Sequence, residues 1–143
     1  MGRMALSGVS SADPPIPSAV VVAGDEETRV LLRGLLRLHH CRVLGEAGGV
    51  SRAMDLLAHQ RPSVLVADVN LSEGSYTDLL TEAKRLDPTL RIILVVPSPR
   101  AHAPVPDGAR PDALLYRPFR IREFAEALAN VRPPPPVPGP RSP

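Results

Sequence analysis

The sequence predicts an α/β fold: a doubly wound, five-stranded parallel sheet in the order 2-1-3-4-5, with helices on both faces. Short apolar runs alternate with segments of helical periodicity along the 143-residue chain. The runs within 18–24, 63–68 and 91–96 are continuously apolar rather than alternating, which is typical of parallel strands covered on both faces. Right-handed crossovers between such strands place the helices in two layers.

Each element is predicted from its own pattern. The five strands are expected at "SAVVVAG", "CRVLGEA", "SVLVAD", "RIILVV" and "ALLY". Apolar residues at helical spacing predict helices from Glu26 to about His39, from Val50 onward, over Tyr76–Leu86 and over Ile121–Val131. Acidic residues at 25–27 suit the N-terminus of the first helix. The buried stripe of that helix is expected to comprise Leu31, Leu32, Leu35, Leu36 and Leu38.

The segment between the fourth and fifth strands, 97–112, is unlike the other connections. It carries five prolines, which leave no stretch able to form three uninterrupted helical turns. We therefore expect an irregular connection here and about four helices in the domain.

Composition narrows the class of protein. The net charge is +2, aromatic residues make up 3% of the chain and Trp is absent, which disfavours a nucleic-acid partner. The sequence has no signal peptide and no apolar run of membrane-spanning length, so a cytoplasmic protein without a membrane segment is expected. Residues 1–17 are predicted to be a disordered leader and 132–143 a disordered Pro-rich tail, which flank a domain at 18–131.

Two acidic side chains follow strands that the predicted order makes neighbours. Asp25 comes after the first strand and Asp68 ends the third, and sites in open α/β sheets form beyond the carboxyl ends of the strands. Carboxylate and carbonyl oxygens suit Mg²⁺, and a carboxylate is a possible nucleophile toward phosphorus. Arg117, at the end of the fifth strand, supplies a cation that would neutralise a transferred phosphoryl group.

Three stretches together resemble one known family. The stretches "SVLVADVNLSEG", "GARPDALLYRPF" and "VLGEAGGVSRAMDLL" are similar to the receiver domains of two-component response regulators, over about residues 18–131. The resemblance implies a flavodoxin-like fold with Asp68 as phosphoacceptor and the carbonyl of Asn70 as a metal ligand. It places Arg117 where the family has a lysine, and Pro118 as a candidate for a cis peptide bond.

The chain departs from the family pattern at the site itself. The family's acid pair falls on Ala23-Gly24, although a one-residue slip in the loop would bring Asp25 or Glu26 to a metal. The tentative ligands of a weak Mg²⁺ site are therefore Asp25, Glu26, Asp68 and Asn70. The altered switch positions are Val96, where the family has a hydroxyl, and Leu114, where it has an aromatic ring, with Tyr116 on the same strand face.

Three hypotheses for the function follow. The first is an atypical stand-alone receiver, not an enzyme, that binds a protein partner without phosphorylation; the partner is a histidine kinase or a downstream regulator. The second is a working receiver phosphorylated on Asp68 by a histidine kinase with Mg²⁺. The third is a flavodoxin-like nucleotide-binding enzyme, which is disfavoured because "AGDEET" lacks the glycines of a phosphate-binding turn. The missing helix belongs to the face through which receivers pair, so the oligomeric state stays open.

Overall fold

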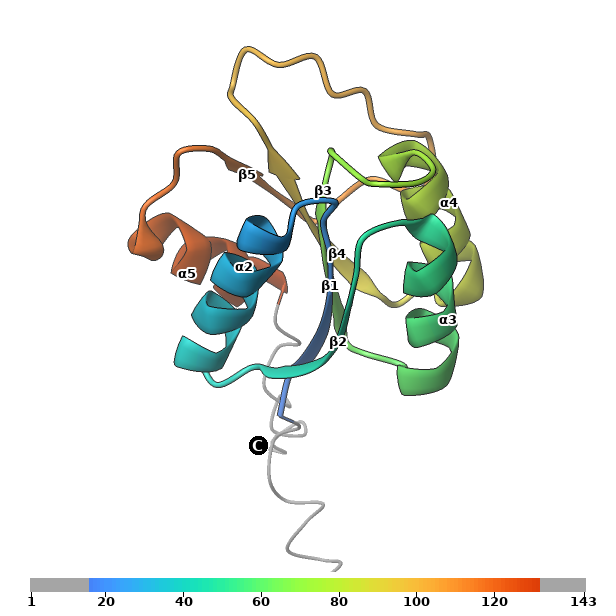
Figure 1. The fold of residues 1–143 in the computed structure, drawn as a ribbon, viewed down its shortest axis with the longest axis horizontal. Coiled ribbons are helices and arrows are strands. Elements are labelled where there is room, and N and C mark those ends of the chain that lie inside the picture. Colours follow the sequence, from blue (N-terminus) through green and yellow to red (C-terminus); the bar gives the residue numbers. More distant parts are fainter. Residues whose placement is uncertain (1–15, 132–143) are drawn as a thin grey trace, which may run out of the picture.

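The computed structural model describes residues 16–131, so the predicted tail and nearly all of the predicted leader lie outside the described residues. The described chain forms five strands and four helices (Figure 1). The strands are β1 Ser18–Val22, β2 Arg42–Ala47, β3 Val64–Asp68, β4 Arg91–Val96 and β5 Ala113–Tyr116. The helices are α2 Glu26–Leu38, α3 Val50–Gln60, α4 Tyr76–Leu86 and α5 Ile121–Val131.

The sheet has the predicted topology. All four strand pairs are parallel and the order is β2-β1-β3-β4-β5, which confirms the predicted fold class. The sheet lies between two helical layers, with α2 and α5 on one face and α3 and α4 on the other (Figure 1). Asp68 ends the central strand β3, at the sheet edge where the loops after β1 and β5 also lie (Figure 1).

Alternation along the strands divides the core into two clusters. In β1, Val20 and Val22 pack with residues of α3 and α4, whereas Ala19 and Val21 pack with residues of α2 and α5. Every residue of β3 is buried, as its continuous apolar run predicts. Full burial of one such Val or Leu side chain contributes about 1.5–3 kcal/mol, so the central strands anchor the fold.

The buried stripe of α2 differs from the predicted one. Leu32, Leu35 and Leu36 are buried, but Leu31 is 49% exposed and Leu38 is 59% exposed. With 3.6 residues per turn, Leu31 and Leu38 lie on the flank of the helix rather than on the face toward the sheet. The fourth buried residue is Thr28, one turn before Leu32, and the sequence reading did not include it.

The segment 97–112 forms no helix, as its prolines predict, and instead runs as an irregular strap from the end of β4 across to α4 and back to β5 (Figure 1). Ala109 is buried, and Ala101 and Ala103 pack against the same core cluster. The hydroxyl of Tyr76, in the first turn of α4, donates a 2.8 Å hydrogen bond to the carbonyl of Pro104. The strap leaves Leu114 and Tyr116 of β5 exposed.

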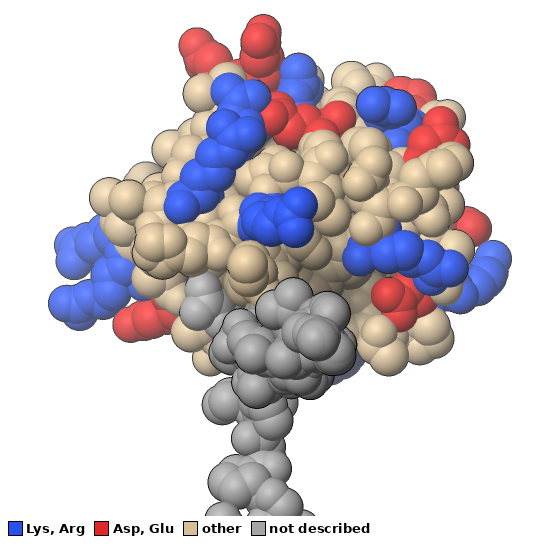
Figure 2. All heavy atoms as spheres, turned by 90° about the horizontal axis from the view of Figure 1, so that it is seen from below, with Lys and Arg blue, Asp and Glu red and all other residues tan. Residues whose placement is uncertain are grey.

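The surface carries scattered charge. Figure 2 shows one face on which basic side chains lie apart from one another, with uncharged surface and some acidic side chains between them. Within residues 16–131, no helix is long and apolar enough to span a membrane.

We expect Tyr76→Phe to loosen the strap without disturbing the sheet. The change removes the bond to Pro104, and a lost neutral hydrogen bond of this kind costs about 1 kcal/mol. Urea denaturation should report that loss, and amide exchange should accelerate at Ala101, Ala103 and Ala109. Tyr116→Phe is the matched control, because that hydroxyl bonds to no residue within 16–131. Unchanged exchange in Tyr76→Phe would show that packing alone holds the strap.

Candidate functional site

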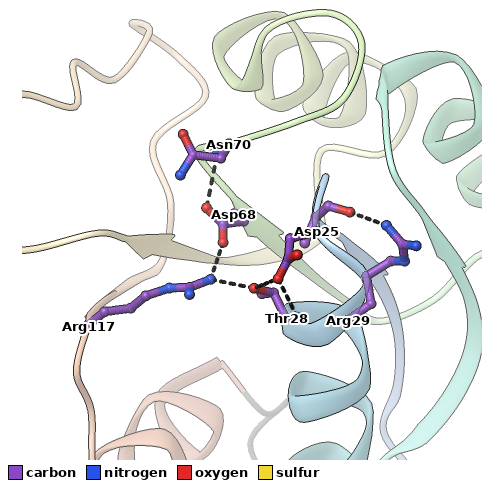
Figure 3. A network of polar contacts seen from close by, with 7 residues as sticks. Asp25, Thr28, Arg29, Asp68, Asn70 and Arg117 are labelled. Atoms are coloured by element: carbon purple, nitrogen blue, oxygen red, sulfur yellow. Dashed lines mark hydrogen bonds and ion pairs between the residues drawn. The ribbon is translucent and has the colours of Figure 1, made fainter.

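Asp68 is the centre of the candidate site. It is the last residue of β3 and only 3% exposed. Its Oδ1 accepts a 2.9 Å hydrogen bond from the backbone amide of Asn70, and its Oδ2 accepts one from Nη2 of Arg117 (Figure 3). Both carboxylate oxygens therefore have a donor, and the guanidinium balances the charge of a buried acid.

Arg117 reaches Asp68 from the end of β5. Its backbone amide donates to the carbonyl of Val96, and the peptide bond to Pro118 is cis. The side chain is 36% exposed, so the ion pair joins a partly solvated cation to a buried anion. The same Nη2 also donates a 3.0 Å hydrogen bond to Oγ1 of Thr28.

Thr28 connects this pair to Asp25, because its hydroxyl accepts from Arg117 and donates to Oδ2 of Asp25. Asp25 is the N-cap of α2 and also accepts the backbone amide of Thr28, at 3.0 Å. Asp25 and Asp68 therefore belong to one network, as the sequence predicts. The guanidinium of Arg117 and the hydroxyl of Thr28 lie between them (Figure 3). The sequence reading missed Thr28, although its position three residues after Asp25 is the spacing of an N-cap pair.

The cap determines the ionisation of Asp25. The backbone amide of Thr28, followed by its hydroxyl, holds the pKa of Asp25 below the ordinary value of 3.8. The positive charges of Arg117 and Arg29 lower this pKa further.

A second arginine, Arg29 of α2, reaches the end of β1 with its side chain. Arg29 donates a 2.7 Å hydrogen bond from Nη1 to the carbonyl of Ala23, and its Nε lies 3.9 Å from Oε1 of Glu46. Arg33 completes the cluster with a 2.6 Å ion pair to Oε2 of Glu46. Sequence reasoning did not identify this cluster, since an arginine one turn into a helix has no local pattern that predicts its contacts.

The residues at the metal position do not fit Mg²⁺. Gly24 occupies a family acid position, but a Cβ there would lie 2.8 Å from the backbone nitrogen of Ser72, which leaves no room for a carboxylate. The carbonyl of Asn70 accepts the amide of Gly24 at 2.9 Å. Asp25 caps α2, and Glu26 is exposed without a bond to any residue of the described chain. Within 16–131 no three His, Cys, Asp or Glu side chains are grouped as ligands.

The side chains at the altered switch positions take no part in the hydrogen bonds of the network. Val96 is buried in the core cluster under α3 and α4, where its side chain offers no hydrogen bond. Leu114 and Tyr116 lie on β5 with their side chains exposed. Val96 therefore supplies no hydroxyl to the site, whereas the hydroxyl of Thr28 accepts a hydrogen bond from Arg117.

We expect Arg117→Ala to destabilise the fold more than Asp68→Asn. Removing the cation leaves a buried carboxylate without its charge partner, which costs about 3 kcal/mol. Removing the acid leaves an arginine that can turn toward water, at a cost of about 1 kcal/mol. The double variant should recover most of the larger loss in urea denaturation at neutral pH. Additive losses in this double-mutant cycle would show that the two side chains are not coupled.

Stability should also depend on the charge of Asp25. Because its pKa is lowered in the folded protein, its contribution is present above the unfolded value of 3.8 and is lost as the pH falls through the folded value. Asp25→Asn keeps a cap acceptor without a charge. The stability advantage of the wild type over this variant should therefore shrink on acidification. Asp55→Asn, at an exposed carboxyl of α3, should not reproduce the effect.

Known proteins were compared with the chain in sequence and in structure. No family model matches the sequence. The transcriptional regulatory protein PdtaR of Mycobacterium tuberculosis is 29% identical over 122 residues, in each of two strains. The match covers 83% of this chain but 58% of the length of PdtaR.

Solved structures are similar over most of the chain. A signal receiver domain of an HD domain-containing protein from Pseudomonas fluorescens has a TM-score of 0.71 and 18% identity, over 82% of this chain and 94% of that one. A CheY-like receiver domain protein from Methanospirillum hungatei has a TM-score of 0.69 and 18% identity, over 80% and 92%. A receiver domain protein from Clostridium thermocellum has a TM-score of 0.68 and 17% identity, over 80% and 93%. These similarities confirm the resemblance: the chain has the fold of a response-regulator receiver domain.

Proposed function

We propose that this chain is an atypical receiver domain of two-component signalling that works by binding a protein partner, without phosphorylation of Asp68. The observation that carries the proposal is the occupation of both Asp68 oxygens, by the guanidinium of Arg117 and the amide of Asn70. In this role the chain is a binding module and not an enzyme.

Phosphoryl transfer to Asp68 has little support from the surrounding residues. A transferred phosphoryl group needs a metal ion and cations to neutralise its charge. Here Arg29 donates a hydrogen bond to the carbonyl of Ala23, beside the position where acids would hold the metal. The space next to Gly24 is filled by the backbone of Leu71 and Ser72, which leaves no room for a metal-binding side chain at position 24.

The loops around Asp68 are tied to one another. The amide of Gly24 donates to Asn70, that of Ser72 donates to Gly48, and that of Val50 donates to Glu73. The carboxylate of Glu73 also accepts the amide of Ser51, at 3.0 Å. A modification of Asp68 shifts an equilibrium between two conformations only if the modified side chain interacts more favourably in one conformation than in the other. Loops held in this way, with no hydroxyl at Val96, support a single state.

The proposed partner surface is α5 with its preceding residue Arg120, together with Tyr116 and the proline strap. Tyr116 of β5 and Ile121 of α5 are large apolar side chains that are exposed on this surface. The partner would be a histidine kinase or a downstream regulator.

The second candidate is a receiver that is phosphorylated on Asp68 by a histidine kinase and uses Tyr116 in switching. The observation in its favour is the Thr28 hydroxyl, 3.0 Å from Nη2 of Arg117, which is the same atom that donates to Asp68; this hydroxyl would take the place of the one absent at Val96.

Incubation with a small phosphodonor and millimolar Mg²⁺ separates the two candidates. We expect the intact mass to stay unchanged and Mg²⁺ to leave the melting temperature unchanged, because residues 16–131 contain no group of three side chains suited to hold the ion. A receiver with an intact acid pair is the positive control for the phosphodonor. A mass increase of one phosphoryl group, absent in Asp68→Asn, would establish the second candidate.

A further inference from the structure

A groove of about 300 Å³ follows the outer edge of β5. The consecutive residues 112–116 form one side, and Glu123, Glu126, Ala127 and Asn130 of α5 form the other. Side chains alternate between the two faces of a strand, so a groove lined by five consecutive residues runs along the backbone edge. Among the described strands, β5 pairs only with β4.

The open edge offers backbone groups for hydrogen bonds. Arg117, the residue directly after β5, donates its amide to the carbonyl of Val96 in β4. Because amides alternate in direction along a strand, Leu115 also directs its amide toward β4, and Leu114 and Tyr116 direct theirs away from it. An exposed edge of this kind is a template on which another extended chain can pair.

The groove is also acidic. Asp112 is balanced by Arg91 and Lys84, at 3.6 and 3.8 Å. Glu123 is exposed and accepts the amide of Arg120. Glu126 is exposed and makes no hydrogen bond or ion pair with any residue of 16–131. The two glutamates therefore favour a positively charged occupant.

Two other occupants fit less well. A second copy pairing through the same edge would bring Glu123 and Glu126 of both copies together, and like charges repel. The segment 132–143 of this chain carries seven prolines, which have no amide to donate to a sheet.

We propose that β5 takes up an extended, basic peptide segment of a partner protein as a sixth strand. Apolar side chains of that segment would contact Leu114 and Tyr116 on one face, and its lysines or arginines would meet Glu123 and Glu126 on the other. Pro111 and Pro118 flank β5 and limit the pairing to its short length. The inference rests on the proposed function and names the class of partner.

The test uses the full chain and a short peptide of alternating valine and lysine, together with the same peptide N-methylated at every second residue. We expect the first peptide to bind, slowing amide exchange at Leu114 and Tyr116, and the N-methylated peptide to bind at least about tenfold more weakly. Glu126→Lys should weaken binding of the first peptide by about tenfold. Glu82→Lys, on the exposed face of α4, is the matched control and should leave binding unchanged.

Several outcomes would overturn the proposal. Equal binding of the N-methylated peptide would mean that charge alone attracts it. No binding, or no effect of Glu126→Lys, would exclude a basic strand at this edge, and self-association of the peptide-free chain through β5 would identify a second copy as the occupant. None of these outcomes involves a phosphodonor, so each leaves the proposed function to its own experiment.

Discussion

The ion pair between Asp68 and Arg117 is the interaction on which the site depends. It joins the end of the central strand to the end of the edge strand β5, and Thr28 extends it to the first turn of α2. Three segments that are far apart in the sequence therefore meet at one buried carboxylate. Desolvation of that carboxylate is unfavourable, and the pair with its added hydrogen bonds offsets the cost. The positive charge beside this carboxylate comes from Arg117, a residue of the chain itself.

Much of the fold could be predicted because its signals are local. The continuous apolar runs of β1, β3 and β4 marked a covered parallel sheet, and the prolines of 97–112 marked a connection without a helix. The position of Asp68 at a strand end followed from the same run. These features depend on a few neighbouring residues each, so no knowledge of the packing was needed.

The contacts of the site could not be predicted in the same way. Whether Leu31 or Thr28 faces the sheet depends on the rotation of α2 about its own axis. The spacing of apolar residues predicts the helix, but it does not fix this rotation closely enough to decide which residues at the border of the apolar face are buried. The roles of Arg29 and Glu46 depend on an approach between α2 and β2 that neither segment specifies alone. Asp25 was expected near a metal, but its carboxylate accepts the amide and hydroxyl of Thr28 in the same helix.

The prolines of the strap affect the unfolded chain as well as the folded one. A segment without helical or sheet hydrogen bonds normally loses about 1–2 kcal/mol per residue in backbone entropy when it takes a defined course. Each proline has already given up much of that freedom in the unfolded chain, which lowers the entropic penalty by about 0.4–1 kcal/mol. The five prolines of 97–112 therefore stabilise the folded protein by restricting its unfolded ensemble. The strap is held by small alanine side chains, by the hydroxyl of Tyr76 and, at its end, by the bonds of Asp112 to β4 and α4.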